Sequence, residues 1–220
     1  MVFCHFLEPL PGETMRSQLT LRQQATCEVI RAADRTPTAC PAGGESKLGL
    51  RGRFVVEHWR NGKRFNEYHF SNNIANEGKN KLLDVMFHGT TQISSWWLGL
   101  IDNSGYTALA ATDTYDDIDQ AANGWDEFKN FTVSTSTVNR AVWEENAASG
   151  QSMTNSTVAV YDITGSGTVK GLFLVGGIAN AVLKGNHEPG GTLWATALFG
   201  SGDVAVLSGD QLKVTYTVSV

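Results

Sequence analysis

Cysteine is missing from most of the chain: only Cys4, Cys27 and Cys40 occur, and nothing after Cys40 is cysteine. The chain after residue 46 therefore forms no disulfide bond and no thiolate metal site. The odd total also argues against a closed disulfide framework. A reduced, intracellular origin is the simplest interpretation, because disulfides persist mainly in oxidising compartments.

Charge and long apolar runs are also scarce. Charged residues make up 18% of the chain, below the roughly 25% of an average soluble domain, and the net charge is -5. A negative chain is poorly suited to non-specific nucleic-acid binding, which relies on Lys and Arg to neutralise phosphates. No stretch is long and apolar enough to span a bilayer, and residues 1–11 lack the pattern of a signal peptide. We therefore expect neither nucleic acid nor membrane as a partner.

Proline is concentrated in the first segment, residues 1–46, which holds four of the five prolines. Residues 13–33 have the length of one helix but no convincing apolar stripe. We expect residues 1–46 to be an N-terminal arm or poorly ordered extension, or upstream sequence from an early start codon. An ordered arm that clasps a neighbouring subunit is the alternative. The remaining residues, 47–220, have the length of one β domain.

Gly is abundant, and Thr, Ser, Val and Asn recur, which favours strands and tight turns. Asn61-Gly62 supports the positive φ angles of a type I′ turn, so residues 51–59 and 63–70 are predicted to form a hairpin. Strict alternation makes residues 211–220 a strand with one buried face. Further strands are predicted over residues 95–101, 138–143, 156–163, 169–175 and 192–199. The expected fold is mainly β: an antiparallel sandwich or jelly roll with one short helix.

The one good helix candidate is residues 76–87. We expect Asn76 to cap its start and Gly89 to terminate it. Its predicted apolar face consists of Leu82, Leu83, Met86 and Phe87. The acidic and aromatic stretch over residues 106–130 reads as an irregular excursion.

No motif in the chain carries recognisable chemistry. Residues 165–171 approach a dinucleotide fingerprint, but the third glycine is one residue late and a strand follows, so a turn is expected. His58 and His69 fall on neighbouring strands without a third metal ligand. The acidic residues of the excursion lack calcium-loop spacing, which favours a solvated loop over a cation site: Asp113, Asp116, Asp117 and Asp119. We assign no catalytic, cofactor-binding or metal-binding residue and expect a non-enzymatic protein.

Tryptophan supplies the remaining candidates. Trp96, Trp97, Trp125 and Trp143 are candidates for subunit contact or for stacking on a glycan, with core packing as the alternative. Trp96 and Trp97 are consecutive on a predicted strand, so they should point to opposite faces. The outward one marks either a second packed layer or a subunit contact.

Four segments together carry a resemblance to a known group of proteins. They are GRFVVEH at residues 52–58, NEGKNKLLDVMF at 76–87, WLGLID at 97–102 and GDQLKVTYT at 209–217. Their arrangement resembles small proteins encoded among the structural genes of tailed phages, especially short-tailed ones. The resemblance covers roughly residues 47–220 and leaves out the first segment.

This resemblance implies a virion component that is assembled in the cytoplasm of the bacterial host. The leading expectation is a head decoration, or cement, protein that binds the major capsid protein or another virion protein as a homo-oligomer. A tail fibre or tail adaptor protein that contacts a host glycan is the second hypothesis. A carbohydrate-active enzyme that uses Asp116, Asp117 or Glu127 is the third.

Overall fold

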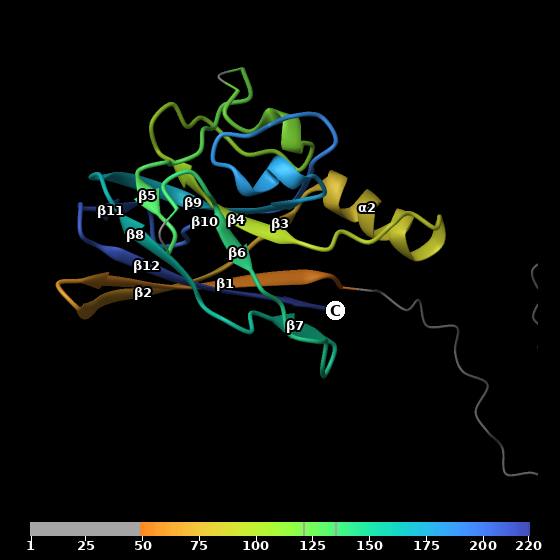
Figure 1. Cartoon of the computed structure of the whole chain (residues 1–220), viewed down its shortest axis with the longest axis horizontal. Helices are drawn as coiled ribbons and strands as arrows, with labels where there is room; N and C mark the ends of the chain where they lie inside the picture. Colours follow the sequence, from red (N-terminus) through yellow and green to blue (C-terminus); the bar gives the residue numbers. More distant parts are fainter. Residues whose placement is uncertain (1–48, 121, 135) are drawn as a thin grey trace, which may run out of the picture. The chain divides into compact units, whose positions relative to one another are not determined.

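The structure is a computed structural model that describes residues 49–120, 122–134 and 136–220 (Figure 1). These residues belong to one compact unit, Leu48–Val220. The segment predicted to be an arm, residues 1–46, lies outside the described residues.

Two antiparallel six-stranded sheets face each other, which confirms the prediction of a mainly β sandwich with one short helix (Figure 1). Sheet A has the order β2 (Lys63–Ser71), β1 (Arg51–Arg60), β12 (Gln211–Ser219), β8 (Ala159–Ile163) and β5 (Phe131–Thr132), and β7 (Ser152–Thr154) also pairs with β12. Sheet B has the order β3 (Asn73–Ile74), β10 (Thr192–Leu198), β9 (Gly167–Gly176), β4 (Trp96–Asp102) and β6 (Ala141–Trp143), and β11 (Val204–Val206) also pairs with β9. The helical elements are α2 (Asn76–Phe87) and the 3₁₀ turns η1 (Tyr115–Asp117) and η2 (Ala179–Val182).

The β1–β2 hairpin forms as the sequence predicts. Asn61 and Gly62 have φ angles of 51° and 71°, the left-handed values that a type I′ turn requires. Along β1, Phe54 and Val56 point into the core, whereas Val55 between them faces outward. β12 closes sheet A by pairing antiparallel with β1, so that Phe54 lies opposite Tyr216. The alternation predicted for residues 211–220 is therefore explained by one buried face.

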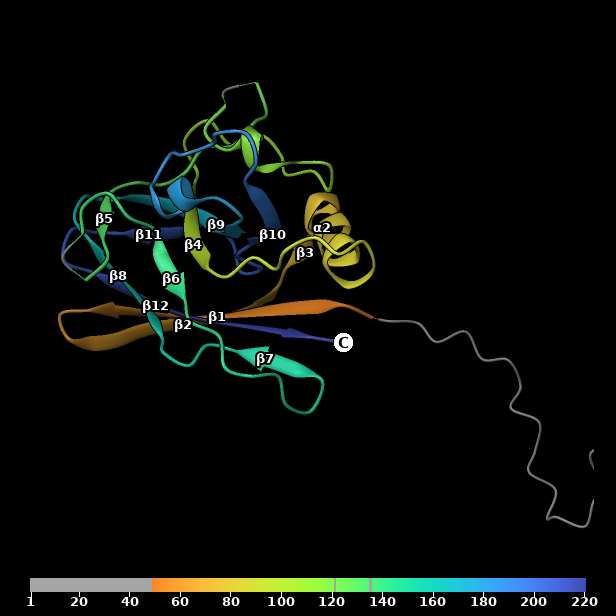
Figure 2. The ribbon, with the colours of Figure 1, turned by 45° about the vertical axis from the view of Figure 1, so that its right-hand side comes forward.

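Sheet B is buried on both of its faces. Leu172 and Leu174 of β9 point into the core between the sheets, while Phe173 and Val175 point into a second apolar cluster on the outer side. Loops from residues 103–130 and 177–191 supply most of the cover for this outer side (Figures 1 and 2). A strand buried on both faces reads as a continuous apolar run, which is why periodicity alone did not reveal the second layer.

Some strands are shorter than predicted because their ends bond to loops. The predicted strand over residues 138–143 reduces to β6, since the backbone N–H of Arg140 donates to Val182 and the carbonyl of Val138 accepts from Lys184. The predicted strand over residues 156–163 begins only at Ala159. The short strands β3, β5, β7 and β11 carried no periodic signal long enough to predict.

Helix α2 has the predicted bounds but not the predicted cap or packing. Ala75 is the N-cap residue and no side chain caps the helix, so the assignment of Asn76 as the cap is wrong. Gly89, at φ 71°, follows the helix end as expected. Leu83, Met86 and Phe87 of the predicted apolar face are exposed by 55%, 65% and 82%. Neither α2 nor the 3₁₀ turns has the length and apolar character of a membrane span.

Candidate functional site

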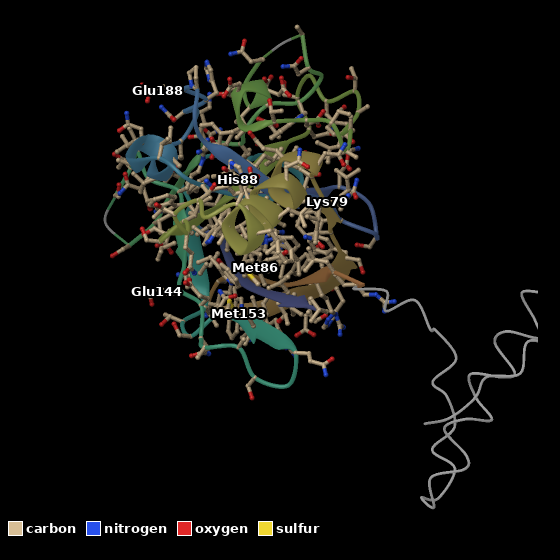
Figure 3. The ribbon with its side chains drawn as sticks, turned by 90° about the vertical axis from the view of Figure 1, so that its right-hand side faces the viewer. Lys79, Met86, His88, Glu144, Met153 and Glu188 are labelled. Carbon is tan, nitrogen blue, oxygen red and sulfur yellow. The ribbon has the colours of Figure 1, made fainter. Side chains whose placement is uncertain are left out.

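An apolar cavity of about 320 Å³ opens at one end of the sandwich, between the inner faces of the two sheets and α2. We call this cavity the mouth. Its lining comprises Trp96, Trp143, Leu174 and Trp194 from sheet B, Met153 and Val218 from sheet A, and Lys81, Leu82, Val85, Met86, Gln92 and Ile93 from α2 and the segment after it. Figure 3 looks toward this end, where Met86 lies on the side of α2 that faces β7 and Met153.

The start of α2 is fixed to sheet B beside the mouth. Gly78 is buried, and a Cβ atom there would come within 2.7 Å of the Trp194 carbonyl oxygen, so only glycine permits this approach. The Glu77 carboxylate accepts backbone hydrogen bonds from Tyr115 at 2.9 Å and Leu193 at 2.6 Å. Burial raises the pKa of Glu77, and these two hydrogen bonds oppose the rise. The helix is therefore held rigidly at its first turn.

The aromatic walls of the mouth are also fixed. Trp96 packs edge-to-face on Trp194, with ring centroids 5.8 Å apart. The indole of Trp194 donates to the Tyr216 hydroxyl at 3.0 Å, and the indole of Trp143 donates to Asn155 at 2.9 Å. Burial raises the pKa of Tyr216 well above its usual value, so this hydroxyl stays neutral. Because the indole N–H groups of Trp143 and Trp194 already have partners, these two residues present mainly apolar ring surface to the cavity.

Lys81 is the only charged residue that lines the mouth, and Gln92 is the only neutral polar one. None of the ion pairs in the described part of the chain involves Lys81. The chain as a whole carries a net charge of -5, so the positive charge of Lys81 at this cavity is opposite in sign to the net charge of the protein.

The structure separates the four predicted tryptophans. Trp125 is 1% exposed and donates to Asp113 within the second cluster, and Trp143 is 4% exposed at the floor of the mouth. These two indoles are therefore not placed for stacking on a sugar ring at the surface. Trp96 lines the mouth, whereas Trp97 packs against the outer cluster, so the two point to opposite faces as predicted. The outward residue, Trp97, is half-buried and contributes to a second packed layer.

Comparison of the chain with models of protein families, with curated proteins and with solved structures finds no match. What the protein can bind therefore follows from its own geometry and chemistry. A concave, apolar cavity with few polar groups is the usual form of a binding site for an apolar group.

A buried ion pair organises the loops that cover sheet B. Arg140 and Glu127 have fully buried side chains and form two parallel hydrogen bonds of 2.9 and 2.8 Å. Arg140 also donates to the carbonyl oxygens of Ala181 at 2.9 Å and Asn186 at 3.1 Å. Burial opposes the charge on Arg140, yet its pair with Glu127 raises the pKa of the guanidinium. Sequence reasoning missed Arg140, which carries no local signal, and considered Glu127 only as a catalytic candidate.

A second charge network lies at the far end of β1. The buried His58 ring contacts the Asp210 carboxylate at 2.8 Å through Nε2, and Arg60 donates to both carboxylate oxygens at 2.8 and 2.7 Å. The hydrogen bond from Arg60 holds the pKa of Asp210 well below its usual range, against the cost of burial. The Nδ1 atom of His58 is buried without a hydrogen-bond partner, so no substrate reaches it without rearrangement. This network joins β1 to the loop before β12.

The acidic excursion uses its carboxylates to shape its own backbone. Asp113 accepts from the Ala110 backbone at 2.9 Å, and Asp117 accepts from Thr114 at 2.7 Å. Asp119 forms an ion pair with Lys129. Within residues 49–120, 122–134 and 136–220, no group of three or more His, Cys, Asp or Glu side chains is placed to hold a metal ion.

The two histidines of the first hairpin point away from each other. His58 faces the core and is fully buried, whereas His69 is exposed on the outer face of sheet A, where it contacts Glu67 at 2.6 Å. In register, His69 lies opposite Val55, and His58 lies opposite Asn66. A shared metal site is therefore not formed by this pair.

Proposed function

We propose that the protein is a non-catalytic structural component of a tailed-phage particle, a decoration protein that binds the head shell and stabilises it. The observation that carries this proposal is the exposed apolar stripe of α2, formed by Leu83 and Phe87 beside Met86. The exposed fractions of the three side chains are 55%, 82% and 65%. Contiguous exposed apolar side chains on a rigid element are typical of a protein–protein contact.

The buried charges support a structural role. Glu127 is neutralised by Arg140, and Asp210 by Arg60. The Glu77 carboxylate holds the first turn of α2 through two backbone hydrogen bonds. Each of these groups joins separate elements or loops of the fold, as a structural role requires.

Sheet A offers a second surface for contacts. Its outer face carries interleaved polar and charged side chains, with Arg53 donating to His69 at 3.0 Å and Lys213 lying 3.9 Å over the Trp59 ring. The covering loops gather instead on the outer side of sheet B (Figure 2). A rigid, polar sheet face suits many modest contacts between copies arranged symmetrically on a shell, and the proposal includes self-association into a homo-oligomer.

The tail fibre or adaptor alternative receives less support. It relied on exposed tryptophans for contact with a host glycan, and both Trp125 and Trp143 are buried. Trp97 is half-buried against the outer cluster. The enzyme alternative relied on Asp116, Asp117 and Glu127, and Glu127 is enclosed by Arg140.

Immunogold labelling of intact particles, produced by the genome that encodes the chain, tests the location. We expect label distributed over the heads. Particles assembled with the double variant Leu83→Ser, Phe87→Ser should carry much less of the protein. Their heads should also break open more readily on heating, because mass action stabilises the assembled head only while the protein is bound.

Val138→Ser is the matched control, since Val138 is 58% exposed at a site outside α2. It should leave head binding unchanged. Label confined to the tail, or no label on any particle, would refute the decoration role. Wild-type binding by the α2 double variant would show that the stripe is not the docking surface.

A further inference from the structure

The mouth is a concave site beside the outward stripe of α2, and Met86 borders both. Its volume of about 320 Å³ lies at the lower end of small-molecule pockets, which range over roughly 300–1,000 Å³. Ten of its twelve lining residues are apolar or aromatic, the exceptions being Lys81 and Gln92. A ligand that fits must therefore be largely apolar and small.

We propose that the mouth binds a linear amphiphile of the fatty-carboxylate class, with its hydrocarbon tail packed against the Trp96 and Trp194 rings and its carboxylate at Lys81. The inference does not depend on the decoration role. The mouth lies on the side of α2 formed by Leu82 and Val85, whereas the docking stripe is centred on Leu83 and Phe87.

The charge of the lining selects an anion. Lys81 supplies an ammonium group, and the lining contains no carboxylate. No acidic side chain of the described residues forms an ion pair with Lys81. An anionic head group can therefore pair with Lys81 without displacing an existing partner, whereas a cationic head group would be repelled.

The apolar lining selects a hydrocarbon tail over a sugar or a nucleoside. The indole N–H groups of Trp143 and Trp194 are already bonded to Asn155 and Tyr216, which leaves few polar groups in the lining: the Trp96 indole N–H and the side chains of Lys81 and Gln92. A sugar carries many hydroxyl groups and would lose most of its bonds to water there without replacement. Methionine adapts its shape easily, and two of them lie across the mouth from each other, which suits a flexible chain of methylenes.

Titration of the full chain with three ten-carbon probes tests the proposal. The probes are decanoate, decanol and decyltrimethylammonium, each kept below its micelle concentration. Binding is followed by calorimetry and by tryptophan emission, since three of the six tryptophans line the mouth. We expect saturable binding at one site, with decanoate about fivefold tighter than decanol, a ratio set by one partly exposed ion pair. Decyltrimethylammonium should bind most weakly.

Two variants locate the site and the head group. Lys81→Met should weaken the binding of decanoate to the level of decanol. The control is Lys79→Met, because Lys79 is an exposed lysine of the same helix outside the lining, and it should change the binding of neither probe. Val85→Phe should reduce the binding of both probes at unchanged circular dichroism, because the added ring fills the cavity. Equal binding of decanoate and decanol, no saturable binding, or binding that survives Val85→Phe would each overturn the proposal.

Discussion

Arg140 and Glu127 form a two-hydrogen-bond ion pair whose side chains are both completely removed from solvent. Arg140 directly precedes β6, and Glu127 lies near the end of the excursion over sheet B. The pair ties this excursion to the segment around Ala181, because the Arg140 guanidinium also donates a hydrogen bond to the Ala181 carbonyl oxygen. A buried pair of this kind adds little compared with well-packed apolar residues, but it is costly to break, because one charge is left without a partner.

Arg140→Ala should lower the free energy of unfolding by about 3–5 kcal/mol, the usual cost of stranding one member of a buried pair. The double replacement Arg140→Met, Glu127→Leu should recover most of that loss, since neither charge remains. Urea denaturation followed by tryptophan emission measures both effects.

Lys170→Ala is the control for this pair, because Lys170 and Asp203 form an ion pair with both side chains partly exposed. It should cost at most about 1 kcal/mol. A loss for Arg140→Ala no greater than that of the control would show that the buried pair does not organise the loops.

Asp210→Asn should make the protein less stable in a pH-dependent way. Arg60 holds the pKa of the Asp210 carboxyl below its usual range, so its contribution is complete above about pH 4, where the carboxyl is ionised in the unfolded chain as well. The contribution is then lost as the pH falls toward the depressed folded value. We expect a difference from wild type of roughly 3 kcal/mol near pH 7, and a smaller one at every step below about pH 4.

The free energy of unfolding of both proteins, measured by denaturation from pH 7 to pH 3, checks this. Asp203→Asn, at the partly exposed pair with Lys170, is the reference and should cost less than about 1 kcal/mol. A difference for Asp210→Asn that grows as the pH falls would contradict the assignment.

Gly78→Ala should destabilise the protein, against the normal trend for helices. Alanine in place of glycine inside a helix is ordinarily favourable by about 1 kcal/mol. At this site the added Cβ atom would lie 2.7 Å from the carbonyl oxygen and 2.9 Å from the Cα of Trp194, so backbone has to move. We expect a net loss of about 1–3 kcal/mol, as for other overpacked sites, and altered tryptophan emission as α2 shifts from the mouth.

Asn80→Ala, on the exposed side of α2, is the comparison. It should leave the free energy of unfolding unchanged or raise it by roughly 0.5 kcal/mol. Equal gains from both substitutions would mean that α2 is not held by close approach at Gly78.

Local signals account for the elements that the sequence predicted well. Asn61 and Gly62 favour positive φ without reference to the rest of the chain, and the alternation of residues 211–220 reflects a period of two. The bounds of α2 follow from local propensity and from Gly89. The capping assignment failed because the first turn is held instead by Glu77, whose partners Tyr115 and Leu193 are remote in sequence.

Predictions about burial and contact were less successful, because these depend on what covers each face. The sequence marked Trp125 as a surface candidate, but the excursion folds over sheet B and encloses it against Phe173. It marked Leu83 and Phe87 as part of a packing face, but both are exposed, and Gly78 is the buried residue of α2.

The amino-acid sequence by itself determined that this chain forms antiparallel strands, one tight hairpin and one short helix, because periodicity and turn chemistry act between near neighbours. Only the tertiary structure decided where the mouth lies and which charges are buried. The lining of the mouth is drawn from residues as far apart as Lys81 and Val218, and Asp210 meets His58 across 152 positions of chain. Such meetings arise from how the two sheets stack, and no short stretch of sequence encodes them.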